Sequence, residues 1–267
     1  MLPQYHSLLA EDGFHCADAA TGRPRPSLRP YVAGYAGFRA DGDGYARRRL
    51  LPLTVTTLIV DLDSAHALVT GPRIAPAVYE RAVWRHGVAV GLTPAGVSAL
   101  LGLPASELVG RSIPFSAAGG AGADELIGRL GEVPDWPGRF ALLEDQLTRW
   151  LQPGKATDGW LMHAWWRLQD PTSWTSIGGL AAELGVSPRG LQLAFQRHIG
   201  MSPKSVARIA RFQRAVHMLS GQDAGFARAV EYGYADQSHF NREVRAMSGL
   251  TPAELFAFVQ DSADARR

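Results

Sequence analysis

The chain has 267 residues, enough for one large domain or two ordinary ones, and two are expected. Hydrophobic residues make up 46% and charged residues 19%, proportions that are typical of a folded globular protein and exclude a disordered one. The net charge is only +2, so any case for nucleic-acid binding depends on where the charges lie.

Cysteine content and hydropathy restrict the class of protein further. Cys16 is the single cysteine, which excludes an intrachain disulfide framework and argues against a cysteine zinc site. Residues 1–6 lack a basic segment followed by an apolar run, so no signal peptide is expected. The most apolar stretch, Leu50 to Val60, is too short to span a bilayer. A cytoplasmic protein without membrane association is therefore expected.

The first half of the chain has a mixed pattern. Prolines repeat through residues 20–30 and predict turns and extended backbone there. The β-branched run 53–63 predicts a strand, and residues 65–70 its partner after a short turn. Residues 87–92 predict a further strand.

Three helices are predicted after these strands. Residues 94–101 form the first, with Thr93 as its N-cap and Pro94 in the first turn. Residues 124–130 and 139–151 have amphipathic spacing and predict the other two. The fold class expected for residues 1–153, the N-terminal domain, is therefore α+β.

After Pro153 the pattern indicates helices alone, so residues 156–260 are expected to form an all-α C-terminal domain. Its first helix, 158–169, places apolar side chains on one face, namely Trp160, Leu161, Ala164, Trp165 and Leu168. Tryptophans at this spacing belong to a core far more often than to a stacking surface, and we interpret them as core.

A weak internal repeat is the strongest signal in the sequence. Residues 180–203 resemble residues 228–252, with an offset that grows from 48 to 49. The matched pairs are Ala181 and Ala229, Gly185 and Gly233, Leu191 and Phe240, Phe195 and Val244, Gly200 and Gly249, and Pro203 and Pro252.

Each copy has the order of residues that a helix-turn-helix requires. A glycine (Gly185 or Gly233) ends a short first helix in the left-handed conformation. Ser187 or Asp236 then caps a second helix, which turns its apolar residues inward and its polar residues outward. The C-terminal domain is therefore predicted to hold two helix-turn-helix units.

A long helix, 203–220, is predicted to join the two units and to bury Val206, Ile209, Phe212, Val216 and Leu219. If rigid, it would place both second helices on one DNA face, roughly 34 Å apart. No acidic residue occurs from Ser187 to Arg214, which favours a polyanionic partner. The cations of this run are Arg189, Arg197, Lys204, Arg208, Arg211 and Arg214.

Residues 176–255 resemble the tandem helix-turn-helix domain of AraC/XylS-type bacterial transcription regulators. The matching pieces are LAAELGVSPRGLQLAFQRHIGMSP, RFQRAVHMLS and GYADQSHFNREVRAMSGLTPAEL. The resemblance implies a domain of about seven helices that reads two successive major-groove segments.

The resemblance also implies residue roles. Base contacts would come from Arg189, Gln192, Leu193, Gln237, Ser238, His239 and Arg242. Phosphate contacts would come from Ser187, Arg197, Lys204, Arg208, Arg211, Asp236 and Arg245. Arginine can pair with guanine and glutamine with adenine, which suits this set. Two departures stand out: Leu193 occupies a position that is often long and polar in the family, and residues 224–228 are poor in helix signals.

The first half does not resemble the cupin barrel of the sugar-responsive members. Residues 88–115, VAVGLTPAGVSALLGLPASELVGRSIPF, are similar to an uncharacterised sensory-type domain that precedes such DNA-binding domains. By analogy it would sense an effector or mediate dimerisation. Tyr79, Trp84 and Trp136 could line an effector pocket, although core packing is the simpler interpretation.

Other candidate sites carry weaker signals. His6, His15 and His86 lack ligand spacing, so no metal and no cofactor are expected. Asp61 and Asp63 could do acid–base work, but a solvated strand end is the simpler interpretation.

The resulting hypothesis is an effector-responsive transcription regulator, an activator by family analogy, with no catalytic residues. Double-stranded DNA is the expected partner, with RNA polymerase and a small-molecule effector, and the protein would be a monomer or homodimer. One alternative is a protein-interaction module with secondary DNA contact. Another is a DNA-repair methyl acceptor fused to the same DNA-binding domain, which would need more cysteines than Cys16.

Overall fold

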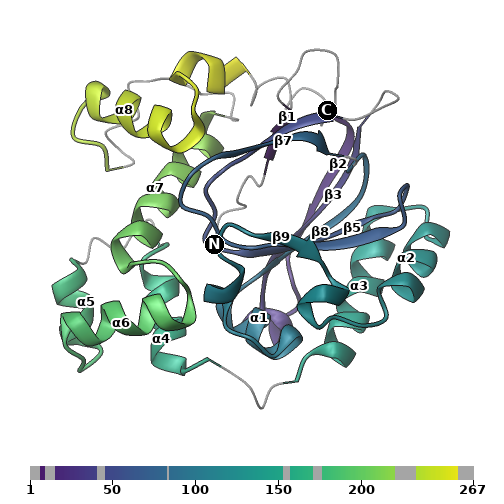
Figure 1. Ribbon diagram of the computed structural model, residues 1–267, viewed down its shortest axis with the longest axis horizontal. Coiled ribbons are helices and arrows are strands. Elements are labelled where there is room, and N and C mark those ends of the chain that lie inside the picture. The colour runs from purple at the N-terminus through teal and green to yellow at the C-terminus, as the bar shows by residue number, and fades with distance from the viewer. Residues whose placement is uncertain are drawn as a thin grey trace.

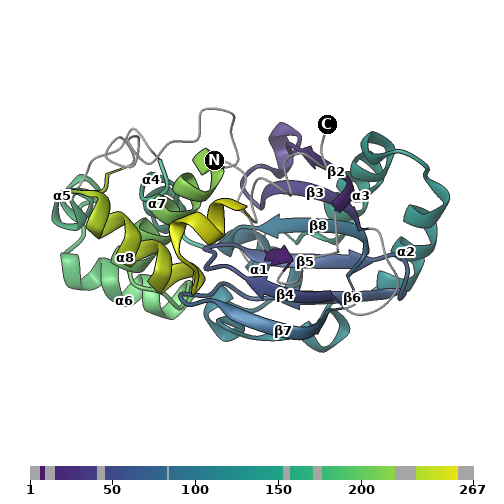
Figure 2. The same cartoon turned by 90° about the horizontal axis from the view of Figure 1, so that it is seen from above.

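The computed structural model describes residues 7–9, 16–40, 46–82, 84–152, 157–170, 176–219 and 233–257. Figure 1 shows two regions, a sheet-rich N-terminal region and a helical C-terminal region. The strands lie between the C-terminal helices on one side and helices α2 and α3 on the other (Figures 1 and 2). The predicted fold class, α+β followed by all-α, is therefore confirmed.

The N-terminal region contains two antiparallel sheets. The larger has the order β2-β3-β8-β5-β6-β9, formed by Cys16–Gly22, Val32–Ala40, His86–Leu92, Thr56–Asp61, His66–Thr70 and Ser112–Pro114. The smaller has the order β1-β4-β7, formed by Ser7–Leu9, Ala46–Leu50 and Ala77–Ala82. Three short 3-10 helices also occur: η1 (Pro26–Leu28), η2 (Ala105–Leu108) and η3 (Ser116–Ala118).

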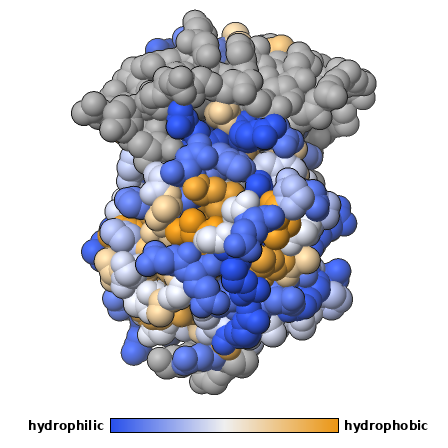
Figure 3. All heavy atoms as spheres, turned by 90° about the vertical axis from the view of Figure 1, so that its right-hand side faces the viewer, coloured by the Kyte–Doolittle hydropathy of each residue, from blue (hydrophilic) through white to orange (hydrophobic). Residues whose placement is uncertain are grey.

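Strand β5 is buried along its whole length because both faces of the six-stranded sheet are covered. Leu58 and Val60 pack in one core with α1 (Pro94–Leu101), α2 (Ala123–Glu132) and α3 (Trp136–Trp150). Ile59 points the other way and packs with Leu50 of the smaller sheet. Figure 3 shows the side on which α2 and α3 lie, where hydrophilic residues surround a central group of apolar ones.

The predicted strands and helices of this region are present. Strands β5 and β6 pair antiparallel around a short turn, and the Thr93 hydroxyl caps α1 by accepting a hydrogen bond from Gly96 N at 3.0 Å. The expectation of a solvated strand end is wrong for Asp61, which is fully buried. Its carboxylate accepts hydrogen bonds from Asp63 N and Ser64 N because it closes the β5–β6 turn.

The described part of the C-terminal region contains α4 (Gly159–Arg167), α5 (Ile177–Glu183), α6 (Pro188–His198), α7 (Pro203–Leu219) and α8 (Gln237–Ser248), and residues 252–257 are also helical. Trp165 is fully buried in their common core, so the interpretation of the tryptophans as core is confirmed for this residue. Trp160 packs against the same core and is partly buried.

This helical core continues into the N-terminal region. Leu51, Leu53 and Val55 lie in the same buried cluster as the residues of α4 to α8. Two buried hydrogen bonds cross the junction: Gln213 Nε2 donates to Pro52 O at 2.8 Å, and Thr54 Oγ1 donates to Gln169 Oε1 at 2.6 Å. The two regions therefore share apolar burial and satisfied polar groups at one interface.

Candidate nucleic-acid interface

The first helix-turn-helix unit is formed by α5 and α6. Gly185 follows α5 with φ +67°, in the left-handed region that only glycine adopts without strain. Ser187 Oγ then accepts a hydrogen bond from Gly190 N at 3.0 Å and caps α6. The predicted helix end at Gly185 and the predicted helix cap at Ser187 are confirmed.

The second unit repeats this arrangement at its turn and second helix. Gly233 has φ +83°, and Asp236 Oδ1 caps α8 by accepting a hydrogen bond from His239 N at 2.6 Å. Gly249 ends α8 with φ +73°, as Gly200 ends the last turn of the first unit with φ +80°. The predicted first helix of this unit, which includes Ala229, and residues 224–228 lie outside the described residues.

The two second helices turn equivalent faces outward. Leu191 and Phe195 of α6 are fully buried, as are Phe240 and Val244 of α8. On α6 the exposed residues other than Pro188 are Arg189, Gln192, Leu193, Gln196 and Arg197. On α8 the exposed residues other than Ala246 are Gln237, Ser238, Asn241, Arg242 and Arg245. We call these sets the α6 strip and the α8 strip. They hold the predicted base-contact residues except His239.

Sequence reasoning missed two members of these strips, Gln196 and Asn241. Each lies three or four residues from a residue that was predicted, so helical spacing alone could have found it. Leu193, by contrast, was predicted to face outward, and it does. It is an apolar residue that is nevertheless 60% exposed.

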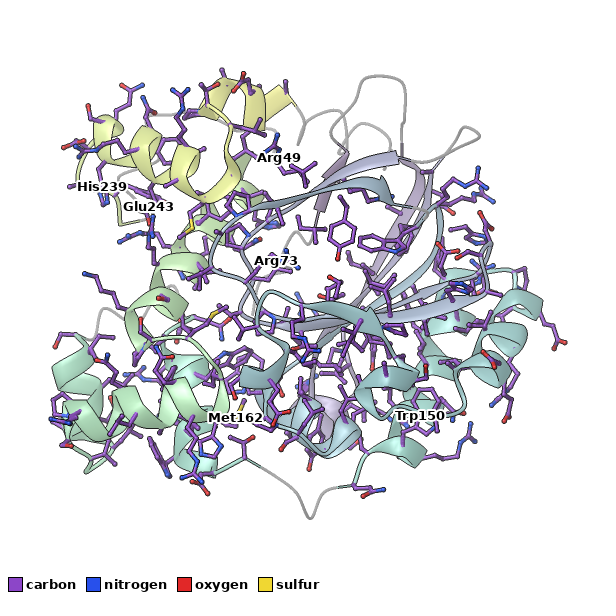
Figure 4. The ribbon with its side chains drawn as sticks, viewed as in Figure 1. Arg49, Arg73, Trp150, Met162, His239 and Glu243 are labelled. Atoms are coloured by element: carbon purple, nitrogen blue, oxygen red, sulfur yellow. The ribbon has the colours of Figure 1, made fainter. Side chains whose placement is uncertain are left out.

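His239 is turned toward the protein. Its Nδ1 accepts a hydrogen bond from Ala235 N at 3.3 Å, and its Nε2 lies 3.8 Å from Glu243 Oε2. Its ring also meets Tyr234 edge to face, with the centroids 5.5 Å apart. Figure 4 shows His239 and Glu243 on the side of α8 that faces α7. The ring nitrogens therefore meet protein groups.

A buried carboxylate joins α8 to α7. Glu243, whose side chain is 9% exposed, accepts from Arg208 Nε at 2.8 Å and from Arg211 Nη2 at 3.3 Å. The run from Ser187 to Arg214 contains no acidic residue, yet two of its arginines have an acidic partner elsewhere in the protein. Their partner comes from another helix, which spacing along the chain cannot reveal.

The other residues predicted to contact phosphates are of two kinds, exposed cations and helix caps. Arg197, Lys204 and Arg245 are exposed cations at the ends of α6, α7 and α8. Ser187 and Asp236 serve as helix caps. Because a carboxylate only accepts hydrogen bonds, the Asp236 side chain offers a phosphate no donor.

The three aromatic residues predicted to line an effector pocket do not lie together. Tyr79 and Trp84 form a ring pair with centroids 5.6 Å apart in the cluster between the two sheets. Trp136 packs in the core on the other face of the larger sheet, with Nε1 donating to Asp18 Oδ2 at 2.8 Å.

Close to Tyr79 lies a buried cation that sequence reasoning did not single out. Arg73 is 6% exposed, and its Nη2 is buried without a hydrogen-bond acceptor among the described residues. Burial lowers the pKa of its guanidinium below the usual value, and Tyr79 opposes this shift. Figure 4 shows Arg73 on the side of the N-terminal region that faces α7.

The described residues contain no group of three or more His, Cys, Asp or Glu side chains able to hold a metal ion. No helix among the described residues has the length and apolar character needed to cross a membrane.

Two regions of the chain match known protein families. Residues 180–257, which include α6, α7, α8 and both turn glycines, match the family described as a helix-turn-helix domain. The C-terminal region therefore carries an AraC-type helix-turn-helix domain, which supports a DNA-binding regulator. Residues 21–114 match a domain of unknown function, DUF6597, which covers most strands of the N-terminal region.

Solved structures similar to this chain differ in how much of it they cover. A DNA-binding transcriptional dual regulator from Escherichia coli K-12 is 22% identical over 39% of this chain and 94% of its own, with a TM-score of 0.34. An AraC-type regulator from Chromobacterium violaceum is 23% identical over 38% and 92%, with a TM-score of 0.36. ToxT from Vibrio cholerae is 11% identical over 92% and 99%, with a TM-score of 0.48. No protein of curated function matches the chain.

Proposed function

We propose that this regulator reads two successive major-groove segments, one with α6 and the other with α8. The observation that carries the proposal is the equivalence of the α6 and α8 strips, which follow equivalent caps and face outward at equivalent positions. Figure 1 places α6 near one end of α7 and α8 near the other. A major groove admits one helix, so two such helices on one scaffold fit two groove segments.

The chemistry of the strips supports separate roles for their members. Arg189 and Arg242 can each donate two hydrogen bonds to a guanine, and glutamine can pair with adenine. Leu193 has no hydrogen-bonding group, and its exposed methyl groups suit the methyl group of thymine. The exposed cations Arg197, Lys204 and Arg245 suit backbone phosphates.

Selection of bound sites from random duplex DNA, with the full-length protein at two salt concentrations, tests this function. The expected result is a motif of two blocks about one helical turn apart, with an affinity that falls steeply as salt rises. A single block would contradict reading by both helices. Absence of any enrichment at both salt concentrations would contradict sequence-specific binding.

We further infer that the N-terminal region responds to an organic acid held by Arg73. Arg73 is buried and its Nη2 has no hydrogen-bond acceptor among the described residues, a costly arrangement that a bound carboxylate would relieve. The neighbouring ring pair of Tyr79 and Trp84 provides apolar surface for the body of such a ligand.

Thermal unfolding with benzoate and octanoate as probes tests the effector proposal. The wild-type Tm is expected to rise with at least one of the two acids, because a ligand that binds only the folded state stabilises it. Arg73→Met is expected to unfold no earlier than wild type without ligand and to lose the response, whereas the exposed Arg111→Met keeps it. A response retained by Arg73→Met, or no response of the wild type to either acid, would contradict the proposal. Contacts with RNA polymerase and the choice between monomer and homodimer stay predictions.

A further inference from the structure

The N-terminal region touches both recognition helices at the same place, the end of the helix where the glycine stands. At the end of α6, Ser106 Oγ donates a hydrogen bond to Arg197 O at 2.7 Å. At the end of α8, Arg49 Nη1 donates to Ser248 O at 3.2 Å. Figure 4 shows Arg49 between the strands and α8. Both contacts use carbonyl groups of a last helical turn, which lack partners within their own helix.

The glycines themselves fit this contact. A Cβ at Gly200 would lie 2.4 Å from Val109 Cγ2 and 2.8 Å from Ser106 Cα, so a side chain there would push the N-terminal region away. A Cβ at Gly249 would lie 2.9 Å from Arg49 Nη1. Gly200 and Gly249 are equivalent in the repeat, so the N-terminal region approaches the two units closely at matching positions.

Residues 71–73 connect the turn that follows η2, close to the Ser106 contact, with Leu53, which lies four residues after Arg49 in the chain. Gly71 N donates to Arg111 O at 2.9 Å, and Gly110 N donates to Pro72 O at 2.8 Å, which fixes this segment to the turn that follows η2. Arg73 pairs with Leu53 through two backbone hydrogen bonds of 3.0 Å. Leu53 in turn is buried in the core that the N-terminal region shares with the DNA-binding helices. We call residues 71–73 the strap.

The strap is closely packed, and it carries the buried cation. A Cβ at Gly71 would lie 1.6 Å from Leu108 O, so the backbone of the strap lies directly against η2. Arg73 stands at its other end. A ligand that moved Arg73 would therefore act on the segment that joins the turn after η2 to Leu53.

We propose that the N-terminal region sets the separation of the two recognition helices, with Ser106 and Arg49 as positioning residues for α6 and α8. This proposal rests on the proposed reading of two DNA segments. Inside the C-terminal region, α7 and the Glu243 ion pairs connect the units; the N-terminal region adds a second, independent connection. Two connections at different points fix an angle as well as a distance, and base reading needs both.

Spacing of the DNA blocks gives a direct readout. In B-DNA each inserted base pair shifts the second block by about 3.4 Å and rotates it about the axis. The measurement uses the full-length protein on duplexes whose two selected blocks are moved together or apart by one base pair at a time. Wild type is expected to lose affinity about tenfold or more at one base pair from the optimum, as for a mismatched contact.

The test variant is the double substitution Ser106→Ala, Arg49→Met, and Arg111→Met is its matched control. Arg111 lies beside the same strap, but its side chain donates only to Glu107 O within the N-terminal region. The double variant is expected to lower the spacing penalty to about threefold or less while keeping the same two blocks, and the control to keep the wild-type penalty.

The outcomes separate this proposal from the one on which it rests. An unchanged spacing penalty in the double variant overturns the positioning role, whereas failure of the wild type to need two blocks overturns the reading of two segments. If the double variant does not fold, Ser106→Ala alone is measured, since it removes one hydroxyl group. A penalty as steep as wild type in that variant likewise overturns the positioning role of Ser106.

Discussion

The two helix-turn-helix units share a backbone plan but differ in how they are held and in what they present. Leu193 of α6 and Arg242 of α8 occupy equivalent positions, because they are 49 residues apart in the chain, as Leu191 and Phe240 are. The first unit therefore presents an apolar side chain where the second presents a cation. The second unit is also tied to α7 by the buried Glu243, whereas Glu183 of the first unit makes its ion pairs at the surface. The same fold can thus combine a unit held by apolar packing with one held partly by charge.

The largest expected effect concerns the apolar packing of the two units. Phe195→Ala is expected to lower the free energy of unfolding by about 3–5 kcal/mol, because it leaves a cavity in a fully buried site. Val244→Ala, at the equivalent position of the second unit, removes fewer atoms and is expected to cost about 2 kcal/mol. Urea unfolding of the full-length variants measures both losses of stability. A larger loss for Val244→Ala than for Phe195→Ala would contradict this account of the packing in the two units.

The ion pairs of the two units are expected to differ in their contribution to the free energy of unfolding, by less than the apolar packing contributes. Glu243→Gln is expected to lower the free energy of unfolding by about 1–3 kcal/mol, because Arg208 and Arg211 lose a charged acceptor that is largely shielded from water. Glu183→Gln is the matched control, with an exposed carboxylate that pairs with Arg167 at 3.2 Å. No measurable change in the urea midpoint is expected for it, since surface ion pairs contribute little. Equal destabilisation by both substitutions would contradict the difference between the units.

Substitutions in the strips are expected to act on DNA binding. Arg242→Ala should weaken binding to the selected site by about 1–3 kcal/mol and relax the preference at one position of the second block. Leu193→Ala should cost about 1 kcal/mol, comparable to one buried methyl contact. Replacing thymine by deoxyuridine in the first block removes that methyl group, and the Leu193→Ala protein should no longer distinguish the two bases. A thymine preference that persists in this variant would assign the contact to another residue.

The smallest expected effect is on salt dependence. Lys204→Ala should reduce the slope of log affinity against log salt by about 1, since Lys204 is an exposed cation. Arg208→Ala should weaken all sequences alike but change the slope less, because Glu243 already pairs with its charge at 2.8 Å. Equal slope changes would mean that Arg208 leaves Glu243 when DNA binds.

Much of the C-terminal region could be predicted from the sequence because its signals are local. The caps Ser187 and Asp236 and the turn glycines Gly185 and Gly233 act within one turn of their own helix. Helical spacing likewise separates the buried Phe195 from the exposed Gln192. The roles of the strip residues in DNA binding stay predictions.

The features that were missed depend on contacts between distant segments. The partner of Arg208 lies 35 residues further along the chain, outside the run from Ser187 to Arg214 that contains no acidic residue. The burial of Asp61 follows from two sheets and a turn that close around it. The contact between Ser106 and Arg197 joins residues that are 91 positions apart. Spacing along the chain carries no signal for any of these.

Repeating the site selection with Leu193→Arg tests most directly whether each helix reads its own block. Leu193 is exposed, so the substitution leaves the core intact and gives α6 the side chain that α8 has at the equivalent position. The expected result is a first block in which a thymine gives way to guanine, with the second block and the spacing unchanged. A change in the second block, or two blocks identical to those of wild type, would contradict the assignment of one block to each helix.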